Sequence, residues 1–142
     1  MKPSAVLIML FALAGCSSGQ KVENCWSPET NQTTTSIIKE IATEYIEGLA
    51  KASERAPLSA DKKQRISDST KITMSDLHVV NRNQDVDRLT CGATVHFSFA
   101  RADNTSISGD TSVEFDVYKG EHGYLYSVAK APIVAMVNSA SE

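Results

Sequence analysis

The side chains of this 142-residue chain that could serve as a general base or a metal ligand are chiefly its three histidines, His78, His96 and His122. A histidine does such chemistry only when a nucleophile, an orienting carboxylate or further ligands lie beside it. The chain has no Gly-x-Ser-x-Gly, Walker, His-Glu-x-x-His or Gly-x-Gly-x-x-Gly motif that would supply them. We therefore predict structural histidines, no catalytic residue, no metal ligand, no cofactor and no enzymatic activity.

A second candidate for metal chemistry is the run "NRNQDVD" at residues 81–87. Its side-chain oxygens alternate along the chain as in a calcium-binding loop, at Asn81, Asn83, Asp85 and Asp87. That loop type needs glycine at its sixth position and glutamate at its twelfth, where this chain has Val86 and Gly92. The pattern favours a polar hairpin loop.

The N-terminal segment is typical of an export signal. Lys2 supplies a positive charge, and the apolar run from Ala5 to Leu13 is shorter than the roughly 18 residues that a membrane-spanning helix needs. The run ends at Leu13-Ala14-Gly15-Cys16, which resembles the lipobox of bacterial lipoproteins. This resemblance implies a signal peptide at residues 1–15 and a mature N-terminus at Cys16 that carries diacylglycerol. An ordinary secretory signal with a chance cysteine is the alternative.

The resemblance leaves two further cysteines, Cys25 and Cys91. With Cys16 lipidated in an exported protein, the remaining pair is predicted to form a disulfide. The alternative, a metal site, would need Cys-x-x-Cys or comparable histidine spacing, which is absent.

The charge of the mature chain excludes an electrostatic nucleic-acid partner. Without Lys2 there are 13 basic and 17 acidic side chains, a formal net charge of −4. The densest basic cluster is Lys62-Lys63-Gln64-Arg65, which Asp61 and Asp68 flank. Phosphate-binding surfaces need more clustered lysine and arginine than this, so membrane attachment is expected through lipid at Cys16.

Residues 16–34 are rich in serine, threonine, asparagine and glutamine, and they are predicted to form a lipidated tether. From residue 35 to Pro57, apolar residues recur every three or four positions and predict an amphipathic helix capped by a residue at 34–36. The apolar stripe comprises Ile37, Ile38, Ile41, Tyr45, Ile46, Leu49 and Ala52. A short second helix is expected from Ser59 to Ile66.

After Ser67 the period changes to two, and four runs rich in valine, threonine and aromatic residues predict antiparallel strands at residues 71–80, 88–100, 106–120 and 122–130. A loop with Asn104 in the left-handed conformation pairs Phe99 with Ile107 and Cys91 with Phe115. A loop at Gly120-Glu121 pairs Val117 with Tyr124, Phe115 with Tyr126 and Val113 with Val128. The first strand needs a bulge near Ser75-Asp76 to keep its apolar residues on one face.

These elements predict one α+β domain at residues 35–142, with the helix on the apolar face of a four-stranded meander. The order of elements is similar in outline to cystatin-like and NTF2-like folds. Fold alone does not define function.

The registered hairpin directs Tyr124 and Tyr126 inward and leaves Tyr118, His122 and Leu125 as candidates for a partner surface. We expect a lipid-anchored lipoprotein of the cell envelope with a non-catalytic binding role and a protein or envelope component as partner. In a Gram-negative host, Ser17 after the cysteine favours the outer membrane, facing the periplasm. The alternative is a lipid-anchored envelope hydrolase with an unrecognised site.

Overall fold

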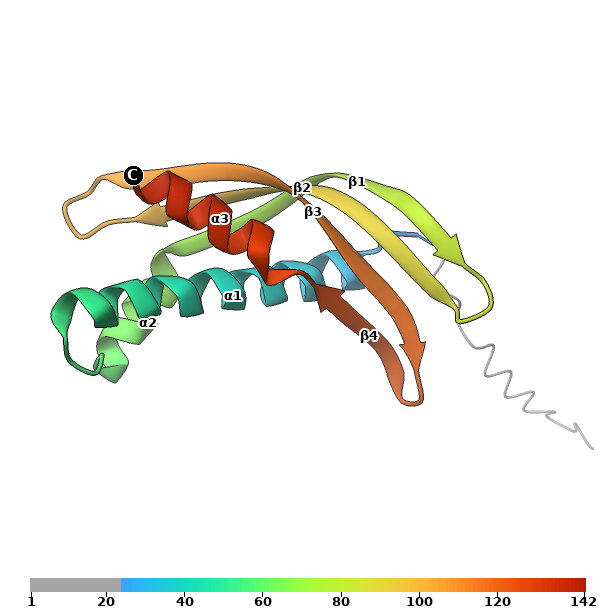
Figure 1. Cartoon of the computed structure of the whole chain (residues 1–142), viewed down its shortest axis with the longest axis horizontal. Coiled ribbons are helices and arrows are strands. Elements are labelled where there is room, and N and C mark those ends of the chain that lie inside the picture. Colours follow the sequence, from blue (N-terminus) through green and yellow to red (C-terminus); the bar gives the residue numbers. More distant parts are fainter. Residues whose placement is uncertain (1–23) are drawn as a thin grey trace, which may run out of the picture.

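The computed structural model describes residues 24–142 of the chain, so the predicted signal peptide and the predicted lipidation site Cys16 lie outside the described residues. Over this range the protein is α+β, with three helices and a four-stranded antiparallel sheet in the order β1-β2-β3-β4 (Figure 1). In chain order the elements are α1 (Pro28–Glu54), α2 (Ala60–Ser69), β1 (Thr70–Asn83), β2 (Arg88–Ala100), β3 (Ser106–Gly120), β4 (Gly123–Val128) and α3 (Lys130–Ser141).

Helix α1 begins seven residues before the predicted start, so residues 28–34 are helical and not a tether. The side-chain oxygen of Ser27 accepts a hydrogen bond from the Thr30 backbone N–H, and Pro28 occupies the first turn. Thr30 and Thr34 are buried one turn apart and extend the stripe that continues at Ile38. Their polar character concealed the stripe in the sequence.

The C-terminal turns of α1 depart from the predicted stripe. Leu49 is 41% exposed and Ala52 is also exposed, whereas Ile38 and Ile41 are buried. Beyond Ile46 the helix faces α2, to which it is joined by the ion pairs Lys62–Glu54 and Lys63–Glu47. Arg55 ends α1 in the left-handed conformation, two residues before Pro57.

Strand pairing confirms the predicted β2–β3 register and the bulge in β1. Phe99 pairs with Ile107 and Cys91 with Phe115, and Asn104 has a φ of 64° in the connecting loop. The β1–β2 register shifts between Ser75 and His78, where Asp76 has a φ of 54°.

The predicted register of β3 with β4 is wrong by two positions. Gly120 pairs with Gly123, so the loop is Glu121-His122, and Gly123 supplies the positive φ of 139°. Val117 therefore pairs with Tyr126, and Phe115 with Val128. A shift of two residues keeps every side chain on its face, so Tyr124 and Tyr126 still pack against the core as predicted.

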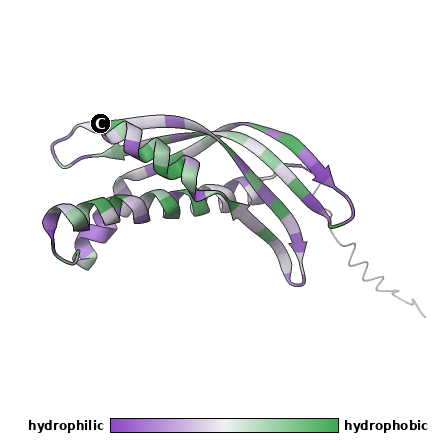
Figure 2. Ribbon diagram, in the orientation of Figure 1, coloured by the Kyte–Doolittle hydropathy of each residue, from purple (hydrophilic) through white to green (hydrophobic). Residues whose placement is uncertain are grey.

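Helix α3 was not predicted. Ile133, Met136 and Val137 are buried in the same core as Ile38 and the inward residues of the sheet. A Cβ on Gly109 of β3 would lie 3.4 Å from the Ala140 Cβ, so the missing side chain lets α3 approach the sheet closely. Figure 2 shows hydrophobic residues along α3 and alternating hydropathy along the strands.

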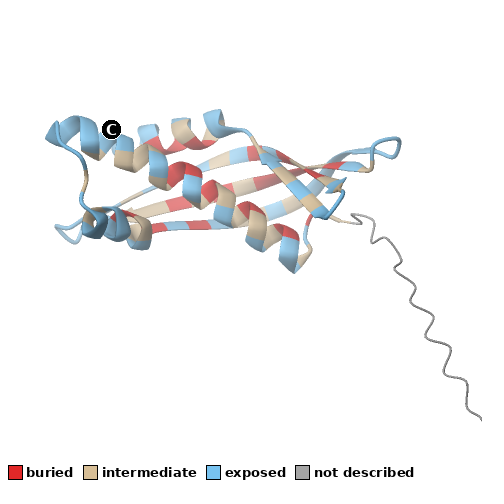
Figure 3. Cartoon of the chain, turned by 90° about the horizontal axis from the view of Figure 1, so that it is seen from below, coloured by how far each residue is buried: buried red, intermediate tan, exposed pale blue. Residues whose placement is uncertain are grey.

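Both long helices lie on one face of the sheet, which arches over them (Figures 1 and 3). The core consists of this inward face, α1 and α3, and its largest fully buried side chains include Phe97, Phe115, Ile38, Leu89 and Ile133. Cys25 and Cys91 are both 0% exposed and form a disulfide that fixes the chain before α1 to β2. Within residues 24–142, the opposite face of the sheet is covered by neither helix.

Candidate functional site

The uncovered outer face of the sheet gathers the polar side chains of the strands. Because side chains alternate between the faces of a strand, the buried positions on β2 and β3 leave their neighbours on the outer face. Cross-strand pairs on this face are Ser98↔Ser108, His96↔Asp110, Thr94↔Ser112, Gly92↔Glu114, Thr90↔Asp116 and Arg88↔Tyr118. We call this surface the open face.

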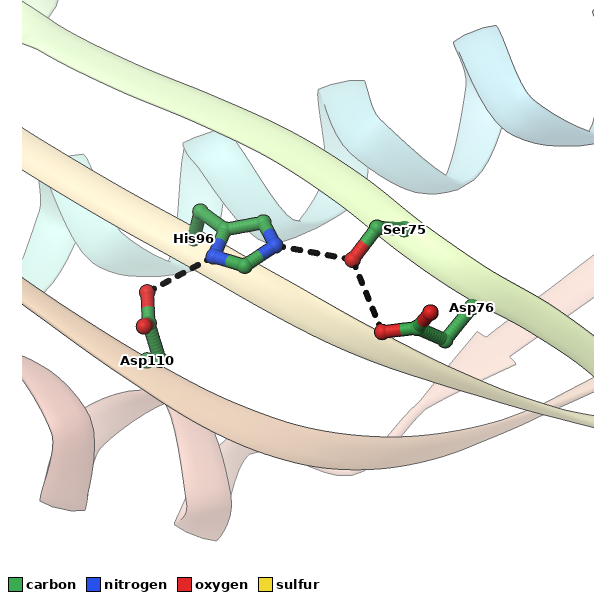
Figure 4. A network of polar contacts seen from close by, with 4 residues as sticks. All are labelled: Ser75, Asp76, His96 and Asp110. Carbon is green, nitrogen blue, oxygen red and sulfur yellow. Dashed lines mark hydrogen bonds and ion pairs between the residues drawn. The ribbon is translucent and has the colours of Figure 1, made fainter.

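A hydrogen-bonded chain of side chains crosses three strands of the open face (Figure 4). His96 Nδ1–H on β2 donates to Asp110 Oδ1 on β3 at 2.8 Å. His96 Nε2 lies 2.8 Å from Ser75 Oγ on β1. Hydroxyl, imidazole and carboxylate therefore stand in the order that serine hydrolases use.

The position of the hydroxyl proton decides what this network can do. Ser75 Oγ also lies 3.0 Å from Asp76 Oδ2, to which it can donate. When His96 is neutral, its Nε2 can accept the Ser75 proton, as a general base requires. When His96 is protonated, both ring N–H groups donate and the hydroxyl donates to Asp76, so every group in the network has a partner. In this second arrangement Nε2 already carries a proton, so the imidazole cannot accept the hydroxyl proton as a base.

No motif in the sequence places a nucleophile or a carboxylate beside His96. The predicted β2–β3 register nevertheless set Asp110 directly opposite His96, which was a usable signal. Ser75 pairs with Thr94 and reaches His96 diagonally, just before the bulge in β1. A bulge alters the direction of neighbouring side chains, so this contact could not be read from spacing alone.

The other two histidines are separate from this network. His78 Nδ1 lies 2.7 Å from the Asp76 carbonyl oxygen. Its ring lies over Gly92, where a Cβ would come within 2.5 Å of Nε2. His122 is exposed in the turn between β3 and β4. The three histidines therefore do not converge.

The open face carries an ion pair and a shallow hollow at its end near the β3–β4 turn. The Arg88 guanidinium binds the Asp116 carboxylate, and the Thr90 hydroxyl donates to the other oxygen of Asp116 at 2.6 Å. These contacts, the Arg88 hydrogen bond first, hold the pKa of Asp116 below its ordinary value. The hollow has a volume of about 310 Å³ and is lined by Val86, Arg88, Asp116, Tyr118 and Ser127.

The predicted partner-surface residues lie in one hairpin, and one of them reaches this hollow. Tyr118 lines it and pairs directly with Leu125, whose side chain lies over Gly120. Leu125 is 52% exposed and Val86 is 61% exposed, which makes them two of the large apolar side chains most open to solvent. We call Val86, Tyr118 and Leu125 the hairpin patch. His122 lies in the same hairpin, at its tip.

Within residues 24–142, no cluster of three or more histidine, cysteine or acidic side chains is arranged to hold a metal ion. None of the helices in this range is both long and apolar enough to cross a bilayer. Residues 81–83 of the "NRNQDVD" run end β1, and residues 84–87 form the turn to β2, where Asn83 Oδ1 accepts from the Asp85 backbone N–H at 3.0 Å.

Comparison of the chain with protein-family models, with curated proteins and with solved structures found no match. The structure defines a fold class: an α+β domain in which α1 and α3 lie on one face of a four-stranded meander and the open face is polar. The outline likeness to cystatin-like and NTF2-like folds stays a prediction.

Proposed function

We propose that this chain is a lipid-anchored protein of the bacterial cell envelope that binds a protein partner through the hairpin patch and catalyses no reaction. The observation that carries the binding role is the exposure of Leu125 and Val86 beside Tyr118. Apolar side chains that project together from a polar face favour association, because a partner would remove them from water. Tyr118 adds an aromatic ring of the kind enriched in interfaces.

The proposed location in the cell envelope rests on the sequence pattern Leu13-Ala14-Gly15-Cys16. Lipid at Cys16 would attach the domain to a membrane without a spanning helix. The disulfide-bonded Cys25 is nine positions further on, so the domain would be held within about 30 Å of the bilayer. In a Gram-negative host, Ser17 favours the outer membrane, facing the periplasm.

The anchor is tested by mass spectrometry of the membrane fraction. We expect an acylated N-terminal peptide that begins at Cys16, and loss of membrane attachment in Cys16→Ser. An unmodified mature N-terminus at another residue would contradict the assignment.

The partner surface is tested by photo-crosslinking of the full chain in native membranes. A photoreactive amino acid at position 125 should give one discrete crosslinked protein, and Tyr118→Lys should abolish it. The matched control is position 135, because Ala135 is exposed on the helical side of the molecule. Crosslinks of equal yield from both positions, or none from position 125, would contradict the proposal.

A second candidate function, a serine hydrolase of envelope esters or amides, is favoured by one observation, the Ser75–His96–Asp110 hydrogen-bond order. Two features argue against it. Asp76 competes for the hydroxyl proton that His96 would have to accept. The sheet also curves so that the open face lies on its convex side (Figure 1), whereas most catalytic sites are concave.

The two functions are distinguished by a fluorophosphonate probe, which labels activated serines. The binding proposal predicts no labelling of the wild-type chain and a normal crosslink at position 125 in His96→Gln. Labelling that Ser75→Ala and His96→Gln both remove would establish the hydrolase instead.

A further inference from the structure

A second concave surface lies at the opposite end of the sheet from the hairpin patch, between α2 and the end of β2 (Figure 1). Its volume is about 630 Å³, which is within the range of small-molecule sites. We call it the end cleft. Its lining includes Lys62, Arg65 and Ile66 from α2, and Phe99, Arg101 and Ala102 from the end of β2 and the loop that follows.

The charges around the end cleft are mostly positive, although the chain as a whole is acidic. Three cationic side chains and one carboxylate, Asp68, line it. Asp68 accepts a hydrogen bond from Gln64, and Lys62 is paired with Glu54. Arg101 lies near Asp103, where its charge contributes to the lowered pKa of that carboxyl after the two Thr105 hydrogen bonds.

Arg65 differs from Lys62 and Asp68, whose side chains have partners. Its side chain is exposed and has no hydrogen bond or ion pair with any residue of the described range 24–142. A guanidinium presents parallel N–H donors that match a carboxylate or a phosphate. Arg65 and Arg101 line the cleft from different elements, α2 and the loop that follows β2.

The remainder of the lining is apolar except for Ser69. Ile66 is 6% exposed, and Phe99 is partly buried against the core. Phe99 keeps part of its surface exposed, which a bare inorganic anion would leave in contact with water and a ligand with an apolar group would cover. Three cationic side chains and a partly exposed aromatic ring in one lining together favour an amphiphilic anion.

We propose that the end cleft binds a small amphiphilic anion, a carboxylate or phosphate monoester joined to a short apolar or aromatic group. The anionic group lies between Arg65 and Arg101, and the apolar group contacts Phe99 and Ile66. This site is independent of the hairpin patch, so failure of either proposal leaves the other standing.

The test uses the full chain in phosphatidylcholine nanodiscs and three fluorinated probes followed by ¹⁹F NMR. The probes are 4-fluorophenylacetate, 4-fluorophenyl phosphate and the neutral 4-fluorobenzyl alcohol. We expect saturable binding of at least one anion and none of the alcohol, and the preferred anion identifies a carboxylate or a phosphate ligand. Arg65→Gln and Arg101→Gln should each raise Kd about tenfold, as loss of a charge-assisted hydrogen bond predicts.

The charge-matched control is Lys63→Gln, because Lys63 lies on the same helix and does not line the end cleft. Its Kd should equal that of the wild type. All three substituted side chains are at exposed positions, so the variants should retain the wild-type melting temperature. No saturable binding by either anion, equal weakening by Lys63→Gln, or binding of the neutral alcohol as tight as that of the anions would overturn the proposal.

Discussion

Removal of the Cys25–Cys91 disulfide should cost this protein a large part of its stability. The bond joins positions 66 residues apart, and closing a loop of that length contributes about 4 kcal/mol in the chain-entropy description. Domains of this size have a free energy of unfolding of roughly 5 to 15 kcal/mol. Both cysteines are 0% exposed, so alanine is the better replacement because it leaves no buried hydroxyl.

The assay is thermal unfolding followed by circular dichroism on the full chain. One kcal/mol corresponds to about 3 to 6 °C for a domain of this length, so the melting temperature of Cys25→Ala should fall by about 12 to 24 °C. Cys91→Ala and the double variant should fall to nearly the same value, because each removes the same covalent bond. Reductant should lower the melting temperature of the wild type and leave the variants unchanged.

Two results would refute this reasoning. A melting temperature of Cys25→Ala within about 3 °C of the wild type would mean that the crosslink does not restrict the unfolded chain appreciably. Alkylation of both thiols in protein unfolded without reductant would mean that the bond is absent.

Three further substitutions test smaller features of the fold. Gly92→Ala places a Cβ against the His78 ring and should destabilise the protein by about 1 kcal/mol in urea unfolding, whereas in a His78→Ala background the same change should cost less, because only the Val80 side chain at 3.1 Å remains close; an equal loss in both backgrounds would count against the ring contact. Thr34→Val replaces a fully buried hydroxyl that has no hydrogen-bond partner, and it should raise the free energy of unfolding by about 1 kcal/mol; a decrease would show that the hydroxyl is satisfied. Asp116 has a lowered pKa in the folded state through Arg88, so its stabilising contribution is present above pH 4 or so and is lost as the pH falls through the folded-state value; Asp116→Asn should therefore flatten the decline of the melting temperature below about pH 4, and an unchanged pH profile would argue against the ion pair.

The sheet could be predicted largely from two independent constraints, the phase of the apolar residues and the turn residues. Both constraints agree for β2 and β3. Asn104 takes the left-handed position in the connecting loop, and the predicted register of the two strands is correct. For β3 and β4 two glycines compete, and the structure uses Gly123 where Gly120 was expected. Registers that differ by two residues put the same side chains on the same face, so the pattern of apolar residues cannot distinguish them. The faces of β3 and β4 were therefore predicted correctly, and their residue pairs were not.

The helices were harder to predict because their termini depend on caps and tertiary packing. Ser27-Pro28 was a readable start signal for α1, but the polar composition of the following turn suggested a tether. Helix α3 has its buried residues at helical spacing, yet it lacks a side-chain cap and follows β4 after one residue. The contact between Ser75 and His96 lies beside a backbone bulge in β1. The φ and ψ angles of a bulge set the direction of the neighbouring side chains, and the spacing of residues in the sequence does not reveal them.

The disulfide also determines how mechanical load would travel through the molecule. The covalent loop between Cys25 and Cys91 contains α1, α2 and β1. Tension applied at the N-terminal end of the chain, where a lipid anchor would hold it, passes from Cys25 through the sulfur atoms directly into β2. The long helix α1 is therefore shielded from that tension, and the first structure to bear it is the pairing of β2 with its two neighbouring strands.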